Sequence, residues 1–207
     1  MMKKQIRNIV FDLGNVLNKC DIDYAVRELA AFSTLDAEAI YRWLNESDII
    51  DRFDIGALSG DEFHAELSKR IGWSGTLESL IKIWENMLVT DNIMVELVRK
   101  LKRQGYNIYV LSNINPFHVR LINGPLSFII ETDGYVFSCE CQMIKPDPRI
   151  FHHLIKQFGL DSTETLFIDD REVNVEAARS LGITSILHES YAETRRQLAT
   201  HCNLALG

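Results

Sequence analysis

The sequence lacks the features that would place the protein in a membrane or on nucleic acid. No apolar stretch approaches the roughly 20 residues that a bilayer-spanning helix needs. Lysine and arginine number 22 against 29 aspartates and glutamates, so the net charge is −7. Because an acidic surface repels a nucleic-acid backbone, we expect no nucleic-acid partner and no membrane. The basic stretch 1–7 has no hydrophobic region or cleavage site after it, which favours a cytoplasmic protein.

Cysteine is scarce, and its spacing does not fit a structural metal site. Of the four cysteines, Cys139 and Cys141 form a CxC pair, whereas structural zinc needs four ligands. We therefore expect reduced thiols in a reducing compartment. Internal repeats and low-complexity tracts are also missing. What remains is an ordinary globular composition, with 207 residues, enough for one core and a small accessory domain.

Two kinds of segment alternate along most of the chain. Short apolar runs rich in Val, Ile, Phe and Tyr predict buried strands at 8–11, 107–111, 165–168 and 183–187. Helical patterns at 91–104, 148–158 and 172–181 are each followed by a glycine, a common helix stop. Strands that alternate with helices of this length predict an α/β fold, with a Rossmann-like parallel sheet and helices on both faces.

One long segment breaks the alternation. Between residues 21 and 88 we find no convincing strand, but about four helical stretches, at 21–32, 36–45, 60–71 and 77–88. Ser59 and Glu62 have the spacing of a capping box. All three tryptophans, Trp43, Trp73 and Trp84, fall here, which suggests a small separate core. We expect a helical cap over 19–88, inserted into a core domain made of 1–18 and 89–207.

Reactive side chains follow the predicted strands. Ligands of an open parallel sheet bind at the carboxyl ends of its strands. The side chains found there are a carboxylate after the first strand, a hydroxyl and an amide after the second, and two carboxylates after the third; a lysine precedes the helix that starts at residue 148. They belong to Asp12, Ser112, Asn113, Asp169, Asp170 and Lys145. The sequence thus predicts that these six residues converge.

Each of these groups suits phosphoryl chemistry. Asp12 is the candidate nucleophile, which would form an aspartyl-phosphate. Asp12 and Asp169 can hold Mg²⁺, together with the backbone carbonyl of Gly14. Ser112 can hydrogen-bond phosphate oxygens, and Lys145 can neutralise the charge that develops in the transition state.

The motifs, in order, resemble those of the haloacid dehalogenase superfamily. They are "FDLGNVL" at 11–17, "LSN" at 111–113, "KPDPRIF" at 145–151, "FIDD" at 167–170 with Asn174, and "LGITSIL" at 181–187. The resemblance covers essentially the whole chain and points to the subfamily with a helical cap after the first strand, subfamily IA. Within it, "FDLGNV", "LSN" followed by His118, and "LGITSI" most resemble the bacterial α-D-glucose-1-phosphate phosphatases.

The resemblance implies a role for each matching position. It makes Asp12 the nucleophile and Ser112 and Lys145 catalytic phosphate-binding groups. Asp169 becomes a magnesium ligand, and Asp170 acts through a magnesium-bound water. It further implies that Asn113 touches the phosphate through its backbone or amide and that His118 lines the site. Asp21, Asp23 and Arg52, at the edges of the cap, could meet a sugar.

Gly14 departs from the usual family pattern, because most family phosphatases carry there an Asp that protonates the leaving oxygen. A general acid is worth roughly 10²–10⁴ in rate. We still expect a Mg²⁺-dependent phosphatase for a small phosphorylated metabolite, such as glucose 1-phosphate, whose anomeric oxygen needs less protonation. The alternatives are a 2-haloacid dehalogenase-like hydrolase and a non-catalytic protein that binds a phosphorylated metabolite.

Overall fold

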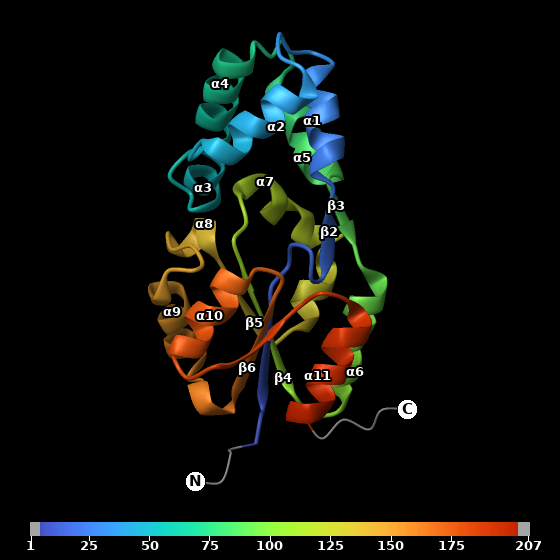
Figure 1. The fold of residues 1–207 in the computed structure, drawn as a ribbon, viewed down its shortest axis with the longest axis vertical. Helices are drawn as coiled ribbons and strands as arrows, with labels where there is room; N and C mark the ends of the chain where they lie inside the picture. The colour runs from blue at the N-terminus through green and yellow to red at the C-terminus, as the bar shows by residue number, and fades with distance from the viewer. Residues whose placement is uncertain (1–4, 203–207) are drawn as a thin grey trace.

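A parallel sheet forms the centre of the molecule. The computed structural model describes residues 5–202, so residues 1–4 of the basic N-terminal stretch lie outside the described part. The five strands follow the order β5-β4-β1-β6-β7, and all neighbouring pairs are parallel. They are β1 (Asn8–Phe11), β4 (Asn107–Ser112), β5 (Gly134–Phe137), β6 (Thr165–Asp169) and β7 (Thr184–Leu187). The predicted α/β class with a Rossmann-like sheet is confirmed (Figure 1).

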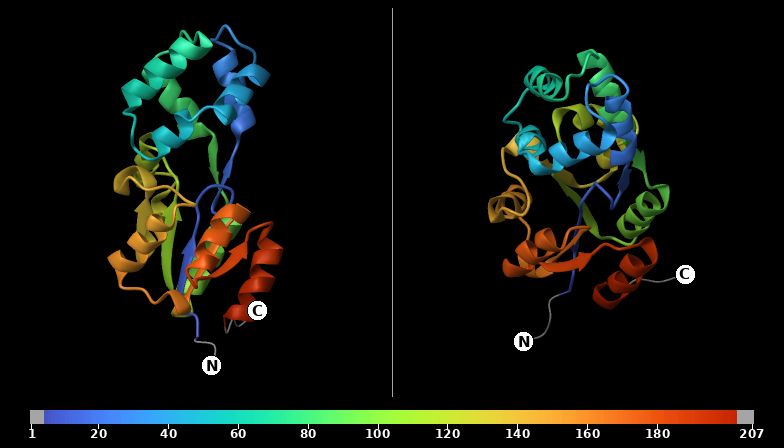
Figure 2. Two further views of the ribbon diagram at one scale, coloured as in Figure 1. Left: turned by 60° about the vertical axis from the view of Figure 1, so that its left-hand side comes forward. Right: turned by 45° about the horizontal axis from the view of Figure 1, so that its top comes forward.

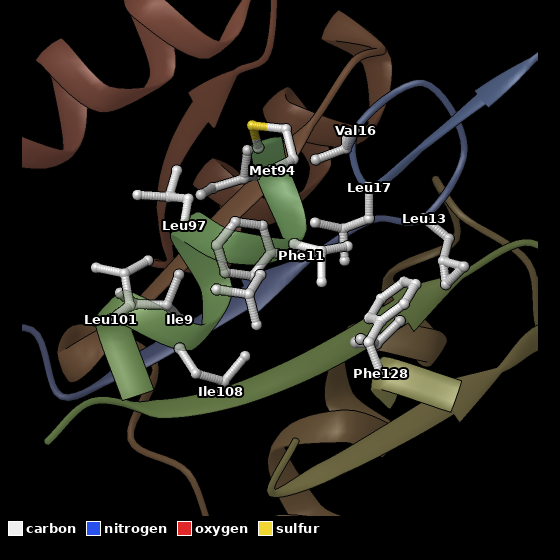
Figure 3. Close-up of a cluster of buried hydrophobic side chains, with 14 of the residues drawn as sticks. Ile9, Phe11, Leu13, Val16, Leu17, Met94, Leu97, Leu101, Ile108 and Phe128 are labelled. Carbon is white, nitrogen blue, oxygen red and sulfur yellow. The ribbon is translucent and has the colours of Figure 1, made fainter. Parts of the chain in front are cut away.

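Helices cover both faces of this sheet. Successive side chains of β1 point to opposite faces, so each face of the strand packs against its own helices. Ile9 and Phe11 belong to one buried cluster, which includes residues of α6 (Asn92–Arg103) and α11 (Tyr191–His201). Figure 3 shows Phe11 surrounded by Leu97 and other apolar side chains of this cluster. Val10 belongs to a second cluster, with residues of α9 (Pro148–Phe158) and α10 (Glu172–Ser180). The predicted strand β1 is thus buried on both faces.

A separate group of helices, which does not cover the sheet faces, lies beyond the carboxyl ends of the strands (Figures 1 and 2). It consists of α1 (Ile22–Ala30), α2 (Ala37–Glu46), α3 (Ile49–Asp54), α4 (Gly60–Ile71) and α5 (Leu77–Asn86). Their buried apolar residues form a cluster that includes Trp73 and Trp84, with Trp43 packed at its margin. The capping box of Ser59 and Glu62 is present at the start of α4.

Two short strands carry the chain into and out of this helical group. β2 (Asn18–Cys20) pairs antiparallel with β3 (Leu88–Thr90), so the two connections run side by side. The predicted boundaries at 18/19 and 88/89 fall in this pair. The division into a core (1–18 and 89–207) and a cap (19–88) remains our proposal, and we use the two names for these ranges.

One element of the core range packs with the cap. Phe117, in α7 (Pro116–Val119), belongs to the apolar cluster of the cap. Its ring lies 4.7 Å from that of Phe53 and 6.0 Å from that of Phe63, edge-on to both. The remaining short elements are α8 (Ser138–Cys141) and three 3₁₀ turns, η1 (Arg120–Asn123), η2 (Ser127–Glu131) and η3 (Ser162–Glu164). Within residues 5–202, no helix has the length and apolar character that crossing a bilayer requires.

Candidate active site

Asp12 lies where the central strand meets the cap. It directly follows β1, and its backbone N–H donates to the Ile168 carbonyl at 2.9 Å, which extends the pairing with β6. β1 lies between β4 and β6, where the strand order reverses, and this is where open α/β sheets bind ligands. Ser112 ends β4 and Asp169 ends β6, so the topology brings both beside Asp12. The predicted convergence of these three positions is observed.

Lys145 joins two of the carboxylates. Its Nζ lies 2.8 Å from Oδ1 of Asp12 and 2.6 Å from Oδ2 of Asp169. All three residues are buried, with Lys145 2 % and Asp12 7 % exposed. Burial lowers the pKa of the Lys145 ammonium, but the two carboxylates outweigh it and raise the pKa above its ordinary value. Lys145 is therefore a permanent cation at the centre of the site.

Burial also governs the charge of Asp12. Loss of water raises the pKa of Asp12 to about 7, and the nearby Asp169 adds to this, while Lys145 opposes it. Oδ1 of Asp12 also accepts a hydrogen bond from the Leu13 N–H at 2.7 Å. Such a carboxylate is poorly solvated, which favours nucleophilic attack once a cation keeps it ionised.

Asn113 holds Lys145 in place rather than presenting its amide to the pocket. Its Nδ2 donates to the Lys145 carbonyl at 3.0 Å, and its Oδ1 accepts the Lys145 N–H at 2.8 Å. Both side-chain groups are thus used, so a contact of Asn113 with phosphate would fall to its backbone. Ser112 Oγ contacts the Asn113 carbonyl at 3.3 Å, a long bond that a phosphate oxygen could replace.

The carboxylates of Asp12, Asp169 and Asp170 could hold a metal ion. One oxygen from each lies within 4.8 Å of the others. Asp169 is oriented by the Arg171 N–H and by Asn174 Nδ2, both at 2.9 Å from Oδ1. Oxygen donors in such a group fit Mg²⁺, which binds one or two carboxylates and keeps several waters. The roles of these residues and of the Gly14 carbonyl as ligands stay predictions.

Gly14 leaves space where most family members carry a carboxylate. A Cβ built on Gly14 meets no atom within 4 Å outside its chain neighbours, and its φ does not lie in the left-handed region. Gly14 lines the pocket, and the backbone conformation at this position does not require a glycine. The next residue, Asn15, has a φ of 53° and donates to Asp170 Oδ2 at 3.1 Å.

A cavity of about 490 Å³ lies between core and cap. Its core wall includes Gly14, Ser112 and Asn113, and its cap wall includes residues of α1, α2, α3 and α5. The volume is typical of pockets for small molecules. The described residues that line it do not include Asp21, Asp23 or Arg52, and the suggestion that these three meet a sugar stays a prediction. Asp21 caps α1, and Arg52 pairs with Glu66 at 2.9 Å.

His118 lies at the wall of this cavity, but its ring is engaged within the protein. Nε2 lies 2.8 Å from the Trp84 carbonyl, and Nδ1 lies 3.3 Å from Asn115 Nδ2. Burial lowers the pKa of His118 to about 4, so the ring is neutral. A neutral ring that donates from Nε2 and accepts at Nδ1 satisfies both contacts. Its predicted role in substrate binding stays a prediction; the observed contacts connect α7 to the cap.

Asp54 is an acidic pocket residue that the sequence did not reveal. It ends α3, a six-residue helix too short to give a periodic pattern, and it lines the cavity. Asn115 Nδ2 donates to its Oδ1 at 3.0 Å. Burial raises the pKa of Asp54 to about 7, and the charge of Asp51 adds to this against the hydrogen bond from Asn115. The side chain is half-buried, and an acidic residue two positions before a glycine, "DIG", is the local signal that the sequence offers.

The chain is similar to known proteins over nearly its full length. The sequence profile of haloacid dehalogenase-like hydrolases matches residues 6–182. D-Ribitol-5-phosphate phosphatase of Bacteroides thetaiotaomicron is 31% identical over 206 residues, which cover 96% of this chain and 99% of that protein. The region matched by the profile contains all the predicted site residues.

Solved structures agree with this similarity. A HAD family enzyme of Bacteroides thetaiotaomicron, in complex with magnesium and inorganic phosphate, superposes with a TM-score of 0.80 at 25% identity, covering 91% of this chain and 98% of that one. The L-2-haloacid dehalogenase of Xanthobacter autotrophicus gives a TM-score of 0.66 at 15% identity, covering 95% and 83%. The latter likeness concerns the fold alone.

Proposed function

The chain belongs to the haloacid dehalogenase-like hydrolase family and is a phosphatase of that family; on this premise we propose that it hydrolyses a small phosphorylated sugar or polyol through an aspartyl-phosphate on Asp12, with Mg²⁺ as cofactor. The observation that carries the proposal is the contact of Lys145 with Asp12 and Asp169 beside Asp170, all at the carboxyl end of the sheet. Glucose 1-phosphate and D-ribitol 5-phosphate are candidate substrates, the second by similarity to the relative's activity.

The residues suggest two chemical steps. In the first, a carboxylate oxygen of Asp12 attacks phosphorus, the bond to the leaving oxygen breaks, and that oxygen takes a proton from solvent or a pocket group other than residue 14. In the second, water attacks the phosphorus of the aspartyl-phosphate, which releases phosphate and regenerates Asp12. Ser112 and Lys145 would bind the phosphate oxygens and stabilise their charge in both steps.

Magnesium fits the carboxylates of Asp12, Asp169 and Asp170. Bound there, Mg²⁺ would reduce the repulsion between the carboxylates and an approaching phosphate and would polarise the phosphoryl group. Lys145 alone offers one positive charge to three carboxylates, so the site remains negative without a divalent cation.

The alternatives are less well supported. A dehalogenase would not need a magnesium ion held by Asp169 and Asp170, and the similarity to a haloacid dehalogenase is limited to the fold. A protein that binds a phosphorylated metabolite without turnover would keep Ser112 and Lys145 but would not need Asp12 ionised. A cytoplasmic location remains part of the proposal, since the proposed substrates are soluble metabolites.

The test is a panel of phosphate esters assayed for released phosphate with Mg²⁺. We expect turnover of at least one sugar or polyol phosphate and none after a chelator is added. Release of halide from 2-haloacids without metal would favour the dehalogenase. Tight binding of an ester without phosphate release would favour the non-catalytic alternative.

A further inference from the structure

Asp54, at the end of α3, is hydrogen-bonded to residues on the core side of the pocket, where the substrate phosphate is expected to bind. Its Oδ1 accepts from Asn115, which lies two residues after Asn113, and its backbone carbonyl accepts from Ser138 Oγ. Ser138 Oγ in turn accepts from the Ile114 N–H at 2.9 Å. These contacts fix Asp54 relative to the loop after β4, where the substrate phosphate is expected. Among the described residues, none donates a hydrogen bond to Oδ2 of Asp54.

Among the described residues, no positively charged group contributes to the pKa of Asp54. The charge of Asp51 raises the pKa of Asp54, and the charge of Asp54 in turn raises the pKa of Cys20 and Cys139. Burial raises the pKa of Cys20 to about 11 and that of Cys139 to about 12, so both thiols are neutral. Within the described part of the chain, the only lysine or arginine lining the cavity is Arg171, which comes from the core.

The same wall offers further hydrogen-bonding groups. Ser47 and Asn45, at the end of α2, line the cavity beside Asp51 and Asp54. Ser47 Oγ is buried and has no hydrogen-bond partner among the described residues. A buried polar atom without a partner costs free energy unless a ligand or water satisfies it. The cap wall therefore combines hydrogen-bond acceptors with negative charge.

We propose that Asp54 is a specificity-determining residue whose Oδ2 accepts a hydrogen bond from a hydroxyl of an uncharged, polyhydroxylated leaving group, and whose charge rejects leaving groups that carry a carboxylate. This inference rests on the proposed phosphatase function and concerns the part of the substrate that leaves. A site that hydrogen-bonds a hydroxyl of its substrate discriminates strongly, because an analogue without the hydroxyl leaves the acceptor of the site unpaired.

The experiment compares wild type with Asp54→Asn and Asp54→Ala at pH 8 in Mg²⁺. Asn keeps an amide oxygen for the bond from Asn115 but loses the charge, whereas Ala loses both. The substrates are D-ribitol 5-phosphate and α-D-glucose 1-phosphate as hydroxylated esters, p-nitrophenyl phosphate as an ester without aliphatic hydroxyls, and phosphoglycolate as a carboxylated one. Asp61→Asn is the matched control, because Asp61 is exposed in the first turn of α4 and does not line the cavity.

For the hydroxylated ester that wild type uses best, we expect kcat/KM of Asp54→Ala to fall about 10-fold or more, mainly through KM, on the scale of a hydrogen bond to a charged group. p-Nitrophenyl phosphate should change by less than about 3-fold, and phosphoglycolate should improve in both variants, which follows from removing like charge. An equal loss on all esters, or no loss on the hydroxylated ones, would overturn the role of Asp54.

A binding measurement separates failure of this inference from failure of the proposed function. Calorimetry with the Asp12→Asn protein, with and without Asp54→Ala, needs no turnover. We expect D-ribitol 5-phosphate or α-D-glucose 1-phosphate to lose about 10-fold or more in affinity, while inorganic phosphate is unaffected. If neither ester binds more tightly than inorganic phosphate, or if both bind equally well in the two proteins, the inference is wrong even for an active phosphatase.

Discussion

Lys145 Nζ and Asp12 Oδ1 lie 2.8 Å apart, and both side chains are almost fully buried. The same ammonium contacts Asp169, so a single cation separates two buried carboxylates. Its removal leaves like charges that face each other at low dielectric, and this relationship leads to the first prediction.

Lys145→Ala should lose both activity and stability. Breaking a buried ion pair from one side typically costs about 3–5 kcal/mol of unfolding free energy. Mg²⁺ should restore part of this loss, because the ion supplies the missing positive charge. Urea unfolding with and without Mg²⁺ measures the effect, and Lys156→Ala, an exposed substitution in α9, is the control. Unchanged stability in Lys145→Ala would contradict the observed pairing.

Magnesium should be required for phosphate release. A chelator should abolish the activity, and added Mg²⁺ should restore it, because three carboxylates repel the substrate phosphate without a divalent cation. Asp169→Ala should weaken Mg²⁺ binding measured by calorimetry more than Asp170→Ala, since Asp169 is completely buried and oriented by two donors. Full activity in excess chelator would exclude the metal assignment.

Gly14→Asp should change the dependence of rate on the leaving group. The structure has room for the side chain, and the backbone is not left-handed. A carboxyl group there could protonate the leaving oxygen, so D-ribitol 5-phosphate should gain ~10-fold or more in kcat/KM, and p-nitrophenyl phosphate should gain little. If a well-folded variant shows the same ratio between the two esters as wild type, the glycine is not the cause of any leaving-group preference.

Asp54→Asn should stabilise the protein at high pH. The folded pKa of about 7 lies above the ordinary value of 3.8, so the folded carboxyl holds its proton where the unfolded one has lost it. Stability related to Asp54 is therefore complete below about pH 4 and is lost as pH rises through 7. The Asp54→Asn protein does not lose this stability at high pH, because the amide does not ionise.

The melting temperature of the ligand-free Asp54→Asn protein should exceed that of wild type by a few degrees at pH 8, on a scale of about 2–4 °C per kcal/mol. At pH 5 the difference should shrink. Differential scanning calorimetry at both pH values measures it, and a difference that is the same at pH 5 and pH 8 would contradict the raised pKa of Asp54.

The sequence predicted the elements that have strong apolar patterns. β1, β4, β6 and β7 were found because their centres are buried on both faces, and their order placed Asp12, Ser112 and Asp169 correctly. β5 was missed because it is a four-residue edge strand that begins with glycine, with only its last two residues buried. The polar helix α11 was missed because few of its residues are buried.

The cap illustrates what the sequence cannot reveal. α3 is less than two turns long, so its periodicity carries little signal, and the wall that it gives the pocket depends on tertiary packing. The bonds from Asn113 to the backbone of Lys145 link residues 32 positions apart, and no local pattern predicts them. The convergence of Asp12, Asp169 and Lys145 was thus predictable from motifs, whereas the contacts of Asn113, His118 and Asp54 were not.

If Asp12 is the nucleophile of a phosphatase, phosphate release should depend on its carboxylate, and the rate of Asp12→Asn shows whether it does. The measurement uses saturating Mg²⁺ and the ester that wild type hydrolyses best, with circular dichroism to show that the variant is folded. We expect kcat to fall by roughly 10³-fold or more, because the amide keeps the shape but cannot attack phosphorus. A folded Asp12→Asn protein that keeps a substantial fraction of the wild-type rate would contradict the covalent mechanism.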